Sequence, residues 1–284
     1  MTKIKFIAFL LFTAFISSCS SDDSAGENQS EYFNFTYDGK KQNVKNWEAL
    51  KQGDFIEVLG TSQESIVIDF KFNVYGNLYQ ALTNPAVITS EVPWLAASEN
   101  FTSNTFTFTL ENLDTKNKTV QVKYSGKVFE NEYDYESEYI MVNGSFKVSY
   151  EEIEPLVKDQ GTFAKIDGKE WHGLVMNTSR ENGTTTLNAE NDSEYTIGIA
   201  YPEGDAAVGT FTFTSNNFAN RISFQKYDLT THEYITYDVS GTITYTTVSD
   251  FYVAGTFNLT ATHPVTKAKV IISGGTFKEG VPFN

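Results

Sequence analysis

Cysteine, histidine and proline are scarce in this chain of 284 residues, which has one Cys, three His and six Pro. Since the single cysteine is Cys19, close to the first residue, we expect no disulfide and no thiol chemistry in the folded part. His172, His232 and His263 have no second His or Cys at metal-binding spacing, which indicates surface or structural roles. Few prolines and 40% hydrophobic residues argue against disorder and favour a packed core.

Motifs of catalysis are missing as well. The sequence contains no Gly-x-Ser-x-Gly elbow, no phosphate-binding loop and no dinucleotide fingerprint. A Ser-His-Asp triad stays open as an alternative, because its members need not be close in the sequence. The sequence therefore predicts that the protein is not an enzyme.

Basic residues are fewer than acidic ones: the chain has 21 Lys and Arg and 36 Asp and Glu, which give a net charge of −15 at pH 7. An acidic surface repels the phosphates of nucleic acids and anionic lipid headgroups. We therefore expect no nucleic-acid partner, whereas the acidity supports solubility and favours cationic partners.

The start of the chain has the pattern of an export signal. Lys3 and Lys5 precede an apolar run over residues 6–16, which is too short to span a bilayer. Two serines then lead directly to Cys19, with Ile16 three positions before the cysteine. This arrangement resembles the lipobox of bacterial lipoproteins, which usually has Leu at that third position. The resemblance implies that residues 1–18 are a signal peptide and that Cys19 carries the lipid that anchors the chain to a membrane.

Polar residues follow the cysteine over residues 19–30 and predict a flexible tether. The acidic stretch of residues 20–24 resembles the signal that exports lipoproteins of the Bacteroidota to the cell surface. The triplet Asp23-Ser24-Ala25 is similar to the O-glycosylation acceptor of the same phylum. The resemblance implies that the protein is anchored by lipid in the outer membrane, on the cell surface.

The remainder of the sequence contains a tandem repeat. Asp38-Gly39-Lys40 recurs as Asp167-Gly168-Lys169, and two longer segments recur in the same order: 122–128 as 237–243, and 142–148 as 253–259. Three ordered matches predict two modules, residues 31–154 and residues 161–284. Pro155 and Gly161 punctuate the join between them.

Alternating side chains predict strands in both modules. Phe106, Phe108 and Leu110 alternate with threonines, and aromatic residues make up 15% of the chain, which favours strands over helices. The only helical candidate is one turn over residues 46–51. We therefore predict an all-β protein whose two modules are antiparallel β-sandwiches or flattened barrels.

Four glycines recur at inward positions of the alternation, two in each module. We predict that Gly126 lies directly opposite Gly144 across one long hairpin, and Gly241 opposite Gly255 across another. Glycine in a strand marks a bend or a close approach, so each pair would leave a notch without side chains. Either an aromatic ring from the facing sheet fills this notch, or the hairpin coils there, or the notch is a ligand groove.

The module pattern resembles that of Bacteroidota lipoproteins of unknown function. The second module fits throughout: a turn at Gly168-Lys169 leads to Trp171, residues 253–259 form the closing pattern, and a last strand contains Gly274-Gly275. In the first module, residues 151–161 replace the last strand, so this module is either truncated or borrows a strand. The resemblance implies a fold and a location but no activity.

The most unusual segment has five carboxylates alternating over nine residues at the tip of a hairpin: Glu130, Glu132, Asp134, Glu136 and Glu138. In an extended strand all five would point the same way and repel one another. Calcium, which takes six to eight oxygen ligands, would relieve this repulsion, so these acids are candidate calcium ligands. Otherwise we expect no cofactor. The alternative is a solvated loop that keeps a long hairpin from aggregating.

Aromatic residues accompany these acids. Tyr133 and Tyr135 lie between them and Trp94 lies in a loop, so all three are candidate ligand-binding residues, with core packing as the alternative. Rings that stack on sugars beside carboxylates that accept hydroxyl groups suit a glycan. We therefore predict a membrane-anchored binding or structural module, without enzymatic activity, whose partner is a glycan or an envelope protein. The alternative is a lipid-anchored polysaccharide hydrolase, which needs two carboxylates about 5–10 Å apart in a cleft.

Overall fold

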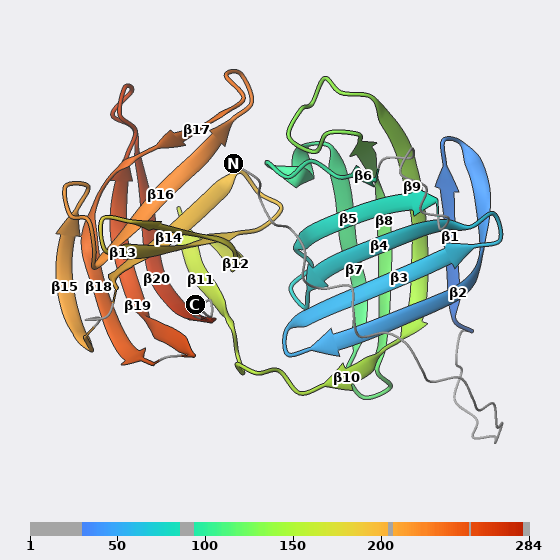
Figure 1. Cartoon of the computed structure of the whole chain (residues 1–284), viewed down its shortest axis with the longest axis horizontal. Coiled ribbons are helices and arrows are strands. Elements are labelled where there is room, and N and C mark those ends of the chain that lie inside the picture. Colours follow the sequence, from blue (N-terminus) through green and yellow to red (C-terminus); the bar gives the residue numbers. More distant parts are fainter. Residues whose placement is uncertain (1–29, 86–93, 204–206, 250, 281–284) are drawn as a thin grey trace. The chain divides into compact units, whose positions relative to one another are not determined.

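Strands form nearly all of the regular structure in the computed structural model, which describes residues 30–85, 94–203, 207–249 and 251–280 (Figure 1). Cys19, the expected signal peptide and most of the expected tether lie outside these ranges. The predicted all-β class is confirmed, because the described ranges contain twenty strands and one 3₁₀ turn, η1 (Thr102–Asn104). Residues 46–51, the one helical candidate, belong to a strand instead.

The first sheet uses ten strands, all from one continuous half of the chain. They are β1 (Tyr32–Tyr37), β2 (Lys40–Gln52), β3 (Phe55–Ser62), β4 (Ile66–Asn73), β5 (Leu78–Pro85), β6 (Leu95–Ala96), β7 (Phe106–Asp114), β8 (Thr119–Phe129), β9 (Tyr139–Ser149) and β10 (Glu151–Ile153). Eight of them follow the order β1-β9-β8-β6-β5-β4-β3-β2, and β2 pairs back with β1, so the sheet closes into a barrel. Outside this ring, β7 pairs with β8, and β10 runs parallel to β2.

The first module closes without a borrowed strand. β1 pairs directly with β9, with Phe35 opposite Gly144, so the barrel needs no counterpart of the last strand of the second module. The barrel therefore closes through β1 and β9 without a counterpart of β20 (Lys269–Gly280), and strand borrowing is wrong. Residues 151–153, which replace the missing strand in the sequence, form β10 instead.

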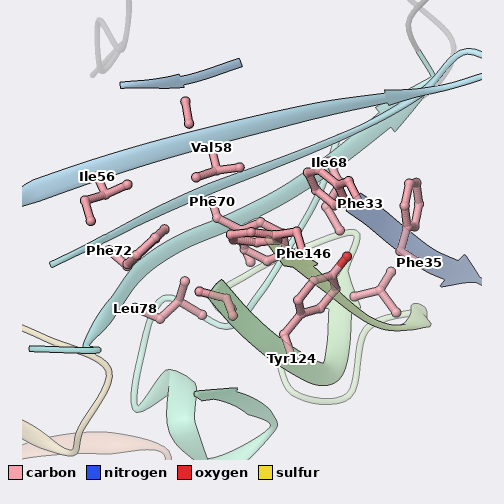
Figure 2. Close-up of a cluster of buried hydrophobic side chains, with 14 of the residues drawn as sticks. Phe33, Phe35, Ile56, Val58, Ile68, Phe70, Phe72, Leu78, Tyr124 and Phe146 are labelled. Atoms are coloured by element: carbon pink, nitrogen blue, oxygen red, sulfur yellow. The ribbon is translucent and has the colours of Figure 1, made fainter. Parts of the chain in front are cut away.

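Aromatic side chains fill the barrel of the first module (Figure 2). The ring of Phe70 is fully buried, and its centroid lies 4.5 Å from that of Tyr124 and 5.8 Å from that of Phe146. An eight-stranded barrel is just wide enough for inward side chains to fill it. Each such side chain stabilises the fold by about 1.5–3 kcal/mol through burial.

The second sheet also has ten strands. They are β11 (Gly161–Ile166), β12 (Lys169–Glu181), β13 (Thr184–Glu190), β14 (Tyr195–Pro202), β15 (Gly209–Thr214), β16 (Arg221–Asp228), β17 (Glu233–Thr236), β18 (Asp238–Val248), β19 (Tyr252–Thr262) and β20 (Lys269–Gly280). Their order is β15-β18-β19-β20-β11-β12-β13-β14-β16-β17. This sheet curls around its own core but keeps β15 and β17 as edges. The expectation of two β modules is thus met by a closed barrel and a curled open sheet.

The two sheets differ in the pairing of one strand, which in the second sheet does not pair with the strand that precedes it in the chain. In the first, β5 follows β4 in the chain and pairs with it. In the second, β15 follows β14 but pairs with β18, and the place beside β14 is taken by the next strand, β16. The strands β17 and β18 follow one another through Tyr237, whose N–H donates to the carbonyl of Phe224 in β16 at 3.0 Å. The repeat in the sequence therefore conceals a difference in topology.

The predicted glycine pairs are wrong in register. Gly144 lies opposite Tyr124, and Gly255 lies opposite Tyr245, whereas Gly126 and Gly241 lie opposite Val142 and Leu259. Two glycines directly opposite each other would leave a gap in the core, whereas a tyrosine opposite a glycine fills that space. In the second module a bulge between Tyr245 and Thr247 shifts the pairing further.

Aromatic rings lie against two of the recurring glycines, Gly126 and Gly255, but they do not come from a facing sheet as expected. A Cβ atom on Gly126 would lie 2.5 Å from Cδ2 of Phe106, and one on Gly255 would lie 2.7 Å from Cζ of Phe277. Both rings belong to the strand paired with the glycine rather than to a facing sheet. The same phenylalanine–glycine pairing recurs at other places: Phe35–Gly144, Phe213–Gly241 and Phe257–Gly275.

Candidate functional site

The five predicted carboxylates lie in the acidic loop, which we define as residues Glu130–Glu138 between β8 and β9. This loop is folded rather than extended: the N–H of Asp134 donates to the carbonyl of Asn131 at 3.0 Å, and the N–H of Ser137 to that of Asp134 at 3.2 Å. Side-chain oxygens of Asn131 and Asp134 each accept the N–H two residues on, which is the Asx-turn habit of these residues. The condition under which all five acids would point the same way, an extended strand, is therefore not met.

The five carboxylates of the acidic loop do not form a cluster that could bind calcium. Four of the five carboxylates are exposed, and Glu132 is half-buried. Across the described part of the chain, no group of three or more His, Cys, Asp or Glu side chains is placed to hold a metal ion. One oxygen of Asp134 already accepts the N–H of Glu136 at 2.8 Å. The calcium site thus stays a prediction from the sequence.

Tyr135 anchors the acidic loop to the neighbouring segment. Its ring packs edge-on against Phe129, with the centroids 6.1 Å apart, and its hydroxyl donates to the backbone carbonyl of Asn100. Beside it, the N–H of Glu99 donates to the carbonyl of Glu132 at 2.9 Å. Burial raises the pKa of Tyr135, which keeps the phenol in its donating form. Tyr135, a candidate ligand-binding residue from the sequence, is positioned to hold the loop.

Exposed aromatic rings lie at this loop. Tyr133 is 52% exposed within it, and Tyr139, which follows its last residue, is 48% exposed with the Nζ atom of Lys127 4.0 Å above its ring. Trp94, 41% exposed, precedes Ala96, which pairs with Phe129 at the base of the same loop. Tyr133, a predicted ligand-binding residue, and Tyr139, which was not among the predicted ligand-binding residues, are thus both exposed in this segment. The signal for Tyr139 was available, because it directly follows the last acid.

A buried carboxyl group in the second module was also missed. Glu279 on β20 is 0% exposed, and its Oε1 atom accepts a hydrogen bond from Oγ1 of Thr162 on β11 at 2.6 Å. Burial raises the pKa of Glu279 to about 7, and the bond from Thr162 partly offsets this effect. The alternation in β20 pointed to this residue, because Phe277 and Glu279 share the inward face.

His172 and His263 pack or hydrogen-bond within the fold, in keeping with the structural roles expected for them. His172 packs edge-on against Phe163 with the ring centroids 5.2 Å apart, and burial lowers its pKa. His263 shapes the turn between β19 and β20, where its Nδ1 atom accepts the N–H of Val265 at 3.1 Å and that of Thr266 at 3.2 Å. An imidazole nitrogen occupied in this way is not available as a catalytic base.

A cavity of about 150 Å³ lies where the turn after β2 meets the segment that follows β10. It is lined by Asp54, Phe55 and Leu156 among others, and Asp54 is the one acidic residue in its lining. Sites for small ligands usually measure about 300–1,000 Å³. This cavity does not supply the two carboxylates that hydrolysis of a polysaccharide would need.

The fold and these surroundings define an all-β protein built from a packed barrel and a curled sheet, with a folded acidic and aromatic loop on the first module. Residues 159–282 match the family described as Domain of unknown function (DUF6252), and this stretch includes β11 to β20. No curated protein and no solved structure matches the chain. The part of the chain that the structure describes contains no apolar helix of membrane-spanning length.

Proposed function

We propose that this chain is a lipid-anchored protein of the outer-membrane surface that binds a glycan through the acidic loop and performs no catalysis. The main support for a binding role is that the hydroxyl of Tyr135 holds this loop by a hydrogen bond while the rings of Tyr133 and Tyr139 stay about half exposed. A loop already ordered before binding loses little conformational entropy on binding, which favours affinity. The lipobox-like sequence before Cys19 supports the location.

Glycan chemistry suits this surface for two reasons. The exposed ring of Tyr133 offers an apolar face on which a sugar ring can stack, and Tyr139 adds exposed aromatic surface beside Lys127. The exposed carboxylates accept hydrogen bonds from sugar hydroxyls. The net charge of −15 opposes sulfated or uronic-acid polymers, because like charges repel at close range. The expected ligand is therefore a neutral or amino-sugar glycan.

A glycan-array screen of residues 31–284 tests this proposal, because this segment forms one compact unit that holds both described cores. We expect binding to neutral glycans that Tyr133→Ala abolishes and Tyr133→Phe retains, since phenylalanine keeps the ring. Phe218→Ala, which removes another exposed ring elsewhere, serves as the matched control and should bind as the parent does. The screen is repeated with calcium and with a chelator, which tests the predicted metal.

Absence of binding on the array would overturn the glycan proposal. Binding that survives both Tyr133→Ala and Tyr139→Ala would place the site away from the acidic loop. Release of reducing sugar ends from a bound polysaccharide would overturn the statement that the protein performs no catalysis.

A further inference from the structure

The strand β15 lies at the edge of the second sheet, where it pairs with β18 alone (Figure 1). At its end, the N–H of Thr214 donates to Oδ1 of Asn217 at 2.8 Å, and the carbonyl of Thr214 accepts the N–H of Asn217 at 3.1 Å. Thr214 therefore directs its backbone groups away from β18. Since residues alternate along a strand, Thr210 and Thr212 direct their N–H and C=O groups to the same free edge.

β15 lacks the features that keep edge strands from associating. Proteins usually protect such edges with charged residues, bulges, prolines or very short strands. The other free edges in the described ranges have such protection. β7 has a bulge after Leu110 and carries Glu111, β10 has three residues of which two are glutamates, and β17 has four residues and begins with Glu233. β15 has the sequence Gly-Thr-Phe-Thr-Phe-Thr, without a charge, a proline or a bulge.

The residues of β18 opposite the threonines of this edge are also uncharged. The residues of β18 opposite the three threonines of β15 are Thr244, Thr242 and Ser240. The hydroxyl oxygens of Thr210 and Thr244 lie 2.9 Å apart across the two strands. In a chain with a net charge of −15, this neutral hydroxyl surface is a place where a second copy approaches without repulsion between charges.

We propose that β15 is a docking edge for β15 of a second copy of this chain, paired antiparallel about Phe211. In this register Thr210 of each copy lies opposite Thr212 of the other, so only backbone groups that are free in the single chain form new hydrogen bonds. Gly209 then lies opposite Phe213, which repeats the phenylalanine–glycine pairing found within both modules. The exposed side chains of Val208 and Phe218, near the two ends of the strand, add apolar surface.

Sedimentation equilibrium of residues 31–284 tests this dimer without a lipid or a glycan, so its outcome is separate from that of the proposed function. We expect a reversible monomer–dimer equilibrium that Thr212→Lys weakens at least tenfold, because a lysine at an edge opposes strand pairing. Thr107→Lys, on the matching strand β7, is the control and should leave the equilibrium unchanged. Circular dichroism checks that both variants fold, and Thr210→Lys replaces Thr212→Lys if that variant does not.

Disulfide trapping tests the register, because residues 31–284 contain no cysteine of their own. Directly hydrogen-bonded partners in an antiparallel pair have Cα atoms about 5.5 Å apart, which a disulfide can bridge. A mixture of Thr210→Cys and Thr212→Cys chains should therefore cross-link faster than either variant alone. A monomer at all concentrations up to about 1 mM, or a dimer that Thr212→Lys and Thr210→Lys do not weaken, would overturn the proposal. Equal cross-linking in all mixtures would overturn the register.

Discussion

Thr162 donates a hydrogen bond from Oγ1 to Oε1 of Glu279 at 2.6 Å inside the second module, so a carboxyl group is held in a core made mostly of apolar side chains. Burial raises the pKa of Glu279 from 4.5 to about 7. In the unfolded chain this group ionises at lower pH than in the folded chain. The free energy of unfolding therefore falls as the pH rises through the interval from about 4.5 to about 7.

The variant Glu279→Gln should lose this pH dependence. Glutamine keeps the acceptor for Thr162 but does not ionise, so the difference in unfolding free energy between variant and parent should grow from pH 5 to pH 8. The expected growth is on the order of 3 kcal/mol, since each unit of pKa shift corresponds to about 1.4 kcal/mol. Urea denaturation at several pH values measures it, with Glu138→Gln on the exposed acidic loop as control. Parallel pH profiles of Glu279→Gln and the parent would contradict this prediction.

Tyr135→Ala should release the acidic loop from its neighbour. The substitution removes both the hydrogen bond to the carbonyl of Asn100 and the ring packed on Phe129. Hydrogen exchange should accelerate at the amides of the loop, because their protection depends on local opening. Tyr133→Ala removes a ring that is more exposed and should leave the exchange unchanged. The same exchange rates in Tyr135→Ala and in the parent would show that other contacts hold the loop.

Gly126→Ala should destabilise the first module. Replacing a strand glycine by alanine normally stabilises by about 0.5–1 kcal/mol, because glycine loses more entropy on folding. Here the new methyl group would lie 2.5 Å from both the Cα atom and the ring of Phe106, and overpacking of this kind costs about 1–3 kcal/mol. Thermal or urea denaturation should therefore show a net loss of stability. Ser125→Ala, one residue away on the exposed face, should change the stability by less than about 0.5 kcal/mol; a stabilised Gly126→Ala would contradict the packing described here.

Side-chain alternation predicted the strands well because it depends only on neighbouring residues. In β8, the buried residues Val120, Val122 and Tyr124 alternate with positions that are half-buried or exposed, as the pattern requires. The register of Gly126 and Gly144 failed because pairing depends on turns, bulges and the volume of the opposite side chain. The pairing of β15 with β18 was not predicted for a similar reason. The sequence of β15 resembles that of β7, but the position of a strand in its sheet is set by tertiary structure.

The site was only partly predictable. The acids and Tyr133 stand out in the sequence, whereas the role of Tyr135 depends on Asn100, 35 residues earlier in the chain. No local pattern predicts a hydrogen bond across that separation. The folding of the acidic loop was closer to prediction, since Asn131 and Asp134 are both residues that favour Asx turns.

Display of both modules from a lipid on Cys19 is the central claim, and comparison of the full chain with its Cys19→Ser variant tests it most directly. Cells that produce each protein are labelled with a palmitate analogue, fractionated, and treated intact with a protease that does not cross the outer membrane. We expect the parent to carry the label, to sediment with membranes and to be cleaved on intact cells. Cys19→Ser should lose the label and leave the membrane fraction. An unlabelled parent, or one that the protease reaches only after lysis, would contradict the claim.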